Sequence, residues 1–376
     1  MAVTATVLRE QAAGERRVAL DPPNAKKLLD QSINVQLQSD SGTSAGFGND
    51  DYEGVSLFTD TPDALANSDV TLWVQPPSAE LARQLKPGSI AIGMVMAHKN
   101  TALVDALKER NISTLAMELV PRITRAQAMD VLSSQATVAG YEATLRAAEL
   151  SPRLFPMLTT AAGTLRPSSV VVIGAGVAGL QAIATARRLG GRVEAYDIRP
   201  DAREQVESLG ARMIDTGVSA EGEGGYAREL TDEEKQQQAD VLAKHLAKAD
   251  VIISTAAIPG RPAPKIITES MVDGMQRGTV IIDLAAESGG NCVLTEPGET
   301  VNRNGVIIDG PLNLASRAPL HASEMYARNI MNLLALMIED GAIKLDREDE
   351  VIEGCLLTHG GELVHETVAK QLDART

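Results

Sequence analysis

The chain has 376 residues, of which 44% are hydrophobic and 23% charged, and its 35 basic and 50 acidic side chains give a formal net charge of -15. This composition excludes an intrinsically disordered chain, and its length favours two domains, at roughly 100–200 residues each. The acidic balance argues against nucleic-acid binding, and the presence of only Cys292 and Cys355 excludes a disulfide scaffold or a cysteine zinc cluster.

No apolar stretch approaches the ~20 residues that span a bilayer, and the N-terminus MAVTATVLREQ lacks a basic region followed by an apolar core. We therefore expect a soluble, intracellular chain without direct membrane insertion. The five histidines show no ligand spacing, so no metal site is expected.

The N-terminal third of the chain alternates short apolar runs with amphipathic runs, which predicts an α/β domain with a parallel sheet. Strands are expected at 3–8, 33–38, 70–75, 90–95 and 113–118, and helices at 24–30 and 101–110. Asp21-Pro22-Pro23 is typical of a helix start. A long helix over 133–148 then leads to a second series.

The second series begins after Pro167. Its expected strands are 170–173, 192–197, 251–255, 279–284 and 306–309, and a helix over 325–338 leads out of it. The last 40 or so residues are expected to be helical and polar and to pack on the first domain, making that domain discontinuous. The expected domains are 1–134 with 318–376, and 135–317, with a cleft between them.

A glycine-rich turn opens the second series. Gly174, Gly176 and Gly179 form G-x-G-x-x-G between an aliphatic strand and an Ala-rich helix expected over 177–189. Such glycines permit a tight turn, backbone approach to a pyrophosphate and close helix–strand packing, while the positive helix N-terminus faces the phosphates. The pattern predicts two Rossmann-like domains of the α/β class, the second of which binds a dinucleotide. The alternative is a tight strand–helix turn without a ligand.

Asp197 ends the next strand, about 20 residues beyond Gly176. A carboxylate there accepts hydrogen bonds from both ribose hydroxyls and repels a 2′-phosphate, so the sequence predicts NAD rather than NADP. Arg199 lies close enough in the chain to soften that preference.

Two further segments carry candidate site residues. The segment 117–134 places Arg122, Arg125, Gln127, Asp130 and Ser133 just before the long helix, where they could grip a pyrophosphate and a carboxamide. The equal alternative is a solvated loop and helix start in which Asp130 pairs with a neighbouring arginine. The Gly-rich, acidic stretch 215–229 contains Tyr226 and suggests a lid, with a disordered insertion as the alternative.

Together these segments resemble the alanine dehydrogenase/transhydrogenase family over almost the whole chain. The resemblance rests on RRVAL at 16–20, PRITRAQAMDVLSSQATVAGY at 121–141, VVIGAGVAGLQAIATARRLG at 171–190, YDIRP at 196–200, GGYARE at 224–229, STAAIPGRPAPKIIT at 254–268 and VIIDLAAESGGNC at 280–292.

The resemblance implies roles for individual residues. Those implied to act in hydride transfer are Arg122, Gln127, Asp130, Ser133 and Tyr226. Contacts to NAD(H) are implied for Arg122, Ile123, Thr124, Gln127, Leu132, Ser133, Gly174, Gly176, Val177, Gly179, Asp197, Ile198, Arg199, Gly225, Gln238 and Ala257.

The family contains two chemistries. An amino-acid dehydrogenase needs an arginine, a lysine, a histidine and an aspartate around its substrate; Arg17 fits the first position, but Gln75, Met96 and Glu287 stand at the others. Hydride transfer between two nicotinamides moves no proton and needs no protein acid or base. The departures therefore favour the transhydrogenase branch over an alanine dehydrogenase. A non-catalytic NAD(H)-binding module is the other alternative, and these departures do not bear on it.

That branch implies NAD(H) on this chain and NADP(H) on a partner, with activity only alongside NADP(H)-binding and membrane-spanning subunits that translocate protons. It further implies Re/Si-specific transfer, a homodimer, and a peripheral position on the cytoplasmic face of a bacterial inner membrane.

Overall fold

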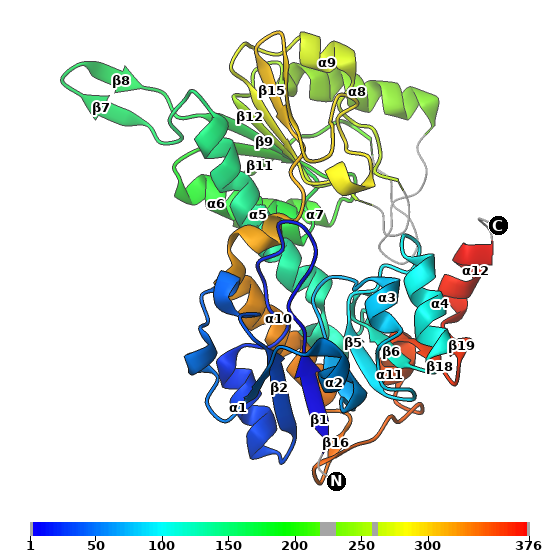
Figure 1. The fold of residues 1–376 in the computed structure, drawn as a ribbon. Coiled ribbons are helices and arrows are strands. Elements are labelled where there is room, and N and C mark those ends of the chain that lie inside the picture. The colour runs from blue at the N-terminus through cyan, green and yellow to red at the C-terminus, as the bar shows by residue number, and fades with distance from the viewer. Residues whose placement is uncertain (1–2, 219–230, 258–261, 374–376) are drawn as a thin grey trace. The chain divides into compact units, whose positions relative to one another are not determined.

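The computed structural model describes residues 3–218, 231–257 and 262–373. The chain divides into two compact units, called unit 1 (Met1–Gln135 with Ala315–Thr376) and unit 2 (Ala136–Leu314). Each unit contains one large sheet covered by helices (Figure 1).

The sheet of unit 1 has the strand order β3-β2-β1-β4-β5-β6-β18-β19. Its first six strands are parallel: β1 (Thr4–Val7), β2 (Asn34–Gln38), β3 (Ser56–Phe58), β4 (Val70–Leu72), β5 (Ile90–Gly93) and β6 (Ser113–Ala116). The early helices are α1 (Pro22–Asp30), α2 (Thr61–Ala66), α3 (Ala79–Ala82) and α4 (Thr101–Glu109). Asp21 caps α1 by accepting from Asn24 N, with proline at the helix start, as the sequence predicts.

The C-terminal region differs from its prediction in two respects. Helix α10 (Pro319–Leu334) starts about two turns earlier than expected, because Pro319 occupies its first turn, where a missing N–H costs nothing. The last 40 residues are not simply helical. They form a small hairpin of β16 (Ile338–Glu339) and β17 (Ala342–Ile343), then α11 (Glu350–Cys355), β18 (Leu356–His359), β19 (Glu362–Leu363) and α12 (Glu366–Asp373).

Strand β18 pairs antiparallel with β6, and β19 pairs with β18 through a Gly360-Gly361 turn. Both glycines have positive φ, as a tight hairpin turn requires. The prediction of a helical tail was therefore wrong. The sequence contained the signal for this hairpin, because a Gly-Gly pair between two short apolar runs is typical of a hairpin turn.

Unit 2 has the strand order β11-β10-β9-β12-β13-β15-β14. Its strands are β9 (Ser169–Ile173), β10 (Arg192–Tyr196), β11 (Arg212–Met213), β12 (Val251–Ser254), β13 (Val280–Asp283), β14 (Thr300–Arg303) and β15 (Val306–Asp309), all parallel except β14. Its helices are α6 (Val177–Arg188), α7 (Ala202–Ser208), α8 (Asp232–Leu246) and α9 (Glu269–Asp273), and α5 (Val131–Leu150) enters it from unit 1.

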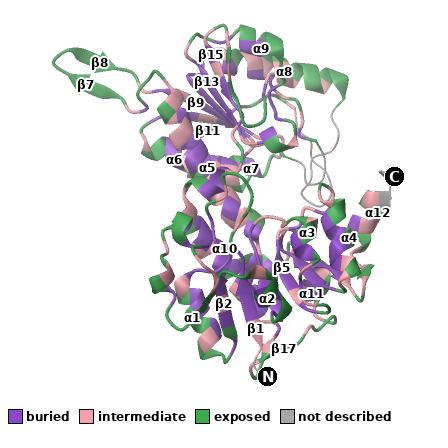
Figure 2. Ribbon diagram, viewed as in Figure 1, coloured by how far each residue is buried: buried purple, intermediate pink, exposed green. Residues whose placement is uncertain are grey.

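Both sheets follow one topology. When only the six parallel strands of each sheet are numbered in chain order, both sheets have the order 3-2-1-4-5-6, which is the doubly wound Rossmann order, and further strands are added at one edge. Alternate residues of β9 enter the cores on the two opposite faces of the sheet: Val170 and Val172 on one side, Val171 and Ile173 on the other. Figure 2 shows such central strands buried along their length. The sequence therefore reads as continuous apolar runs, and the expected fold class is confirmed.

A second hairpin stands apart from the sheet of unit 2. It consists of β7 (Leu158–Thr160) and β8 (Gly163–Leu165), and all six strand residues are exposed. Figures 1 and 2 show it projecting from the rest of its unit. The sequence pattern does not predict it. Among the described residues no helix is long and apolar enough to cross a membrane.

Candidate functional site

The glycine-rich turn joins β9 to α6 at the carboxyl end of the sheet in unit 2. Gly174 has φ 90°, which favours glycine, and a Cβ there would lie 2.7 Å from Thr255 Oγ1. A Cβ on Gly179 would lie 1.8 Å from Gly174 O, so this glycine lets the first turn of α6 close onto the strand. By contrast, a Cβ on Gly176 would meet nothing within 4 Å.

Gly176 is the N-cap of α6, is exposed and therefore faces open space at the positive end of a twelve-residue helix. The first N–H groups of a helix have no partner within it and are suited to bind an anion. The turn lies at the boundary between β9 and β12, where the strand order reverses, and ligands of doubly wound sheets bind at this point. The residues present therefore fit a dinucleotide pyrophosphate.

Helix α5 supports the turn from the other side. A Cβ on Gly140 of α5 would lie 2.1 Å from Ala178 O in the first turn of α6, so the two helices are in backbone contact there. Farther along, Thr144 Oγ1 lies 3.3 Å from Ala182 O. The sequence assigns no role to Gly140, because a single glycine inside a helical pattern does not reveal which backbone approaches it.

Asp197 follows β10 beside this turn, and the chain itself satisfies its carboxylate. Oδ2 accepts from Ala175 N at 2.7 Å and from Arg199 Nη2 at 2.9 Å, while Oδ1 accepts from Arg199 N and Nε. Burial raises the pKa of Asp197, but the hydrogen bonds from Arg199 and Ala175 outweigh burial and leave that pKa below its ordinary value. The charge of the Asp197 carboxylate is therefore compensated by Arg199 within the chain.

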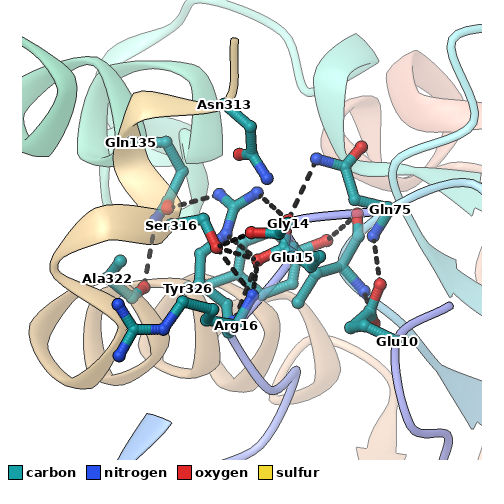
Figure 3. Close-up of polar contacts among 12 residues, drawn as sticks. Glu10, Gly14, Glu15, Arg16, Gln75, Gln135, Asn313, Ser316, Ala322 and Tyr326 are labelled. Carbon is teal, nitrogen blue, oxygen red and sulfur yellow. Dashed lines mark hydrogen bonds and ion pairs between the residues drawn. The ribbon is translucent and has the colours of Figure 1, made fainter. Parts of the chain in front are cut away.

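Unit 1 has a second switch point, between β1 and β4, and buried charged groups occupy its carboxyl edge (Figure 3). Glu10 accepts from Val74 N at 2.7 Å and from Gln75 N at 2.9 Å. Burial raises the pKa of Glu10 to about 7, against the lowering effect of these two hydrogen bonds. No glycine-rich turn follows β1, so this edge is not a second dinucleotide turn.

Arg17 lies in the same cluster and is neutralised within the chain. Its Nη2 and Nε donate to the two carboxylate oxygens of Glu15 at 2.6 and 2.8 Å, and its Nη1 donates to Gln135 Oε1 at 2.7 Å. The side chains of Arg17 and Glu15 are 3% and 0% exposed. Gln75 Nε2 also donates to Glu15, at 3.1 Å. The fork of Arg17 thus holds an internal carboxylate in the geometry with which arginine binds carboxylic acids.

The segment 121–133 lies in unit 1 and is anchored at several points. Its 3-10 helix η4 (Thr124–Met129) buries Ala126 and Met129 in the core of unit 1. Arg125 forms a two-pronged ion pair with Asp349, at 2.7 and 2.8 Å, which lowers the pKa of Asp349 to about 2. Asn329 and Asn332 both donate to Ala128 O.

This anchoring leaves several predicted residues facing outward. Arg122, Thr124, Gln127 and Leu132 are exposed, and Ile123 is partly buried. Among the described residues Asp130 has no arginine partner, in contrast to one alternative for this loop. Its oxygens accept from Ser133 N and Oγ at 2.9 and 2.6 Å, at the start of α5. The loop is therefore held by Arg125, by its backbone and by its buried residues, while the side chains of Arg122 and Gln127 are exposed.

Comparison with known proteins identifies the family. The family model "Alanine dehydrogenase/PNT, N-terminal domain" matches residues 6–139, and "Alanine dehydrogenase/PNT, C-terminal domain" matches residues 143–366. The chain belongs to the alanine dehydrogenase/PNT family. A chain of the NAD(P) transhydrogenase alpha subunit of Rhodospirillum rubrum is 42% identical, over 96% of this chain and 98% of that protein. The alanine dehydrogenase of Bacillus subtilis is 26% identical over 97% of this chain and 94% of its own length.

Solved structures of a transhydrogenase and of an alanine dehydrogenase have the same fold as this chain. The transhydrogenase from Sinorhizobium meliloti superimposes with a TM-score of 0.86 at 40% identity, covering 97% of this chain and 99% of that chain. An L-alanine dehydrogenase superimposes with a TM-score of 0.83 at 21% identity and full coverage of both chains, which shows the shared fold.

The structure brings the predicted residues of this family member together in two groups. Gly174, Gly176, Val177, Gly179, Asp197, Ile198 and Arg199 lie around the turn in unit 2, and Arg122 to Ser133 form the anchored loop of unit 1. Gln238 lies in α8 with a buried Oε1 that has no hydrogen-bond partner among the described residues, and Ala257 is exposed after β12. Gly225 and Tyr226 lie outside the described residues.

Sequence reasoning missed Thr255 beside the glycine-rich turn and Glu15 in the cluster around Arg17. Thr255 Oγ1 donates to Gly174 O at 3.0 Å and so ties the end of β12 to the turn. Its position after the fourth strand was a usable signal, because that strand neighbours β9 in this topology. Glu15 gave no signal, since a charged residue in GERR is typical of a solvated turn.

Proposed function

We propose that this chain is the NAD(H)-binding component of a transhydrogenase and holds NADH for direct hydride transfer to NADP+ on a partner subunit. The main support for the nucleotide assignment is the open space at Gly176. A Cβ on this residue would meet no atom within 4 Å, and the residue lies at the N-terminus of α6 and at the switch point of the sheet. The near-complete coverage of transhydrogenase relatives at about 40% identity supports the choice of branch.

When bound, NADH supplies the hydride, and the protein's task is to bind and orient. The N-terminus of α6 binds the pyrophosphate. Asp197 binds the hydroxyl groups of the adenosine ribose once the Arg199 side chain moves away from the carboxylate oxygens to which it donates. The loop residues Arg122, Gln127 and Asp130 orient the nicotinamide end, with Gln127 reaching toward the second nucleotide. Positioning of this kind accounts for a large share of a rate enhancement without any proton transfer.

An alanine dehydrogenase is the alternative chemistry, and the cluster around Arg17 argues against it. A substrate carboxylate would have to displace Glu15 from a buried, two-pronged ion pair with Arg17. Gln75, which replaces the expected lysine, donates to the same carboxylate. Arg17 is thus already neutralised, and Gln75 stands at the position beside it where an amino-acid dehydrogenase needs a lysine.

The partners follow from the same proposal. NADP(H)-binding and membrane-spanning subunits complete a proton-translocating, Re/Si-specific enzyme, which is active only as that assembly. They keep this chain peripheral on the cytoplasmic face of a bacterial inner membrane. The relatives' designation as subunit alpha supports a multi-subunit assembly.

The hairpin β7–β8 supports a homodimer. The hairpin and its approach carry four exposed apolar side chains, Leu154, Met157, Leu158 and Leu165, which are 55, 63, 40 and 55% exposed. An isolated two-stranded hairpin is at best marginally stable in water, so a projecting apolar one needs a surface to cover it. A second copy of the chain provides that surface. Met157→Glu with Leu165→Glu should convert the dimer to a monomer in sedimentation velocity, and an unchanged dimer would refute this role of the hairpin.

The decisive experiment adds the purified chain to transhydrogenase membranes stripped of their NAD(H)-binding component and follows NADH-dependent reduction of an NADP+ analogue. We expect activity that depends on the added chain. Gln127→Ala should bind NADH within a few-fold of wild type and lose at least tenfold in rate, whereas the exposed control Gln276→Ala should match wild type in both. NADH binding without restored activity would favour the non-catalytic module, and L-alanine-dependent reduction of NAD+ would favour the dehydrogenase.

A further inference from the structure

Asn291 is a fully buried asparagine in unit 2, in the segment that follows β13. Its Oδ1 accepts from Ala256 N at 3.0 Å, and its Nδ2 donates to Ala256 O at 2.7 Å and to Pro264 O at 2.9 Å. One side-chain amide therefore pairs with both polar groups of one residue after β12 and with a second backbone position farther along. Both donors and the acceptor of the amide are engaged, so the side chain has a single satisfied orientation.

The backbone of Asn291 strengthens the same connection. Its carbonyl accepts from Ile266 N at 2.9 Å and from Ile267 N at 3.0 Å. The segment that carries Asn291 is itself anchored by the buried carboxylate of Asp283, which accepts from Cys292 N at 2.9 Å and from Thr295 Oγ1 at 2.7 Å. Asn291 thus holds Ala256 from a region of the unit that is itself fixed.

Ala256 connects Asn291 to the candidate nucleotide site. On one side it adjoins Thr255, whose Oγ1 donates to Gly174 O in the glycine-rich turn. A Cβ on Gly174 would lie 3.1 Å from Ala256 N, so the two backbones are in close contact. On the other side Ala256 adjoins Ala257, which is exposed and for which the family resemblance implies a nucleotide contact.

We infer that Asn291 is a positioning residue for NADH: it fixes the backbone of Ala256 and thereby holds the wall formed by Thr255 and Ala257 against the glycine-rich turn. This inference rests on the proposed function, since it requires the nucleotide to bind at that turn. A side chain without both a donor and an acceptor at this position would leave backbone groups of Ala256 unpaired in a partly buried place, and moving the segment is the way to restore their hydrogen bonds.

Asn291→Asp tests this most directly, because it keeps the size of the side chain and replaces the donor to two carbonyls with an acceptor that repels them. Thr279→Val is the matched control: it removes a buried hydrogen bond to Ala249 O from the same unit and touches neither Ala256 nor the anchors of Asn291. The readouts are the Kd for NADH, from fluorescence titration of the isolated chain well below its unfolding temperature, and the Tm of each variant without nucleotide.

We expect both variants to lower the Tm, and only Asn291→Asp to raise the Kd for NADH, by tenfold or more. If Asn291→Asp does not fold, Asn291→Ala replaces it with the same expected rise in Kd. A lowered Tm with a Kd within twofold of wild type for the Asn291 variants would show a purely structural role and overturn the inference. Wild-type protein that fails to bind NADH would instead overturn the proposed function, so the two failures are distinguishable.

Discussion

Two glycines of one turn should respond differently to the addition of a methyl group. At Gly176 the backbone has φ -75° and ψ -170°, which alanine adopts without strain, and the new Cβ would meet no atom within 4 Å. At Gly179 the new Cβ would lie 1.8 Å from Gly174 O, where an ordinary carbon–oxygen contact needs about 3.3 Å. Gly176→Ala therefore tests ligand approach, and Gly179→Ala tests packing.

The expected magnitudes follow from these contacts. Gly176→Ala should change the free energy of unfolding by less than about 1 kcal/mol, since such substitutions at compatible positions are neutral or mildly stabilising. It should weaken NADH binding by about tenfold to a hundredfold, because the methyl group occupies space next to the helix N–H groups and a hydrogen bond to a charged group contributes about 1.5–3 kcal/mol. Gly179→Ala must move backbone and should cost about 1–3 kcal/mol or more in stability.

The assay is a pair of measurements on each variant: thermal unfolding without nucleotide, and NADH fluorescence titration. Gly179→Ala should lose stability and binding together, whereas Gly176→Ala should lose binding alone. If Gly176→Ala binds NADH as tightly as wild type, the pyrophosphate does not approach this turn and the reasoning from open space at Gly176 fails.

Three further changes have distinct expected outcomes. The pKa of Glu10 is raised from 4.5 to about 7, so the folded chain retains a proton that the unfolded chain releases in that range, and the free energy of unfolding falls as the pH rises through it. Glu10→Gln should flatten this slope in urea titrations between pH 4.5 and 7, and a slope equal to that of wild type would contradict it. Glu15→Ala leaves Arg17 buried without its carboxylate and should cost about 3–5 kcal/mol in urea unfolding, with partial recovery in acetate but not in chloride of equal ionic strength. Recovery that is equal in both salts would show that the fork of Arg17 is not a carboxylate site. Arg199→Ala removes the cation that compensates Asp197 and should raise the ratio of the NADPH to NADH dissociation constants by about tenfold or more, and an unchanged ratio would exclude Arg199 from the choice of nucleotide.

Much of the fold could be predicted because its signals are local. The strand β9 and the helices α1 and α6 lie within a few residues of their expected bounds, since apolar runs, capping residues and glycines act through neighbouring backbone. The start of α10 at Pro319 and the β18–β19 hairpin were missed although Pro319 and Gly360-Gly361 signal them. The exposed β7–β8 hairpin has no apolar alternation to indicate it.

The candidate site divides in the same way. The sequence by itself determined the glycine-rich turn at which we propose that NADH binds, because Gly174, Gly176, Gly179 and Asp197 belong to one strand–helix–strand unit whose geometry their spacing specifies. Contacts between segments distant in the chain were decided only by the tertiary structure. Asn291 reaches Ala256 across 35 residues, and Arg17 reaches Gln135 across 118. Hydrogen bonds of this kind depend on which distant segments the folded chain brings together. Residue type and local spacing describe only neighbours along the chain, so they do not identify such partners.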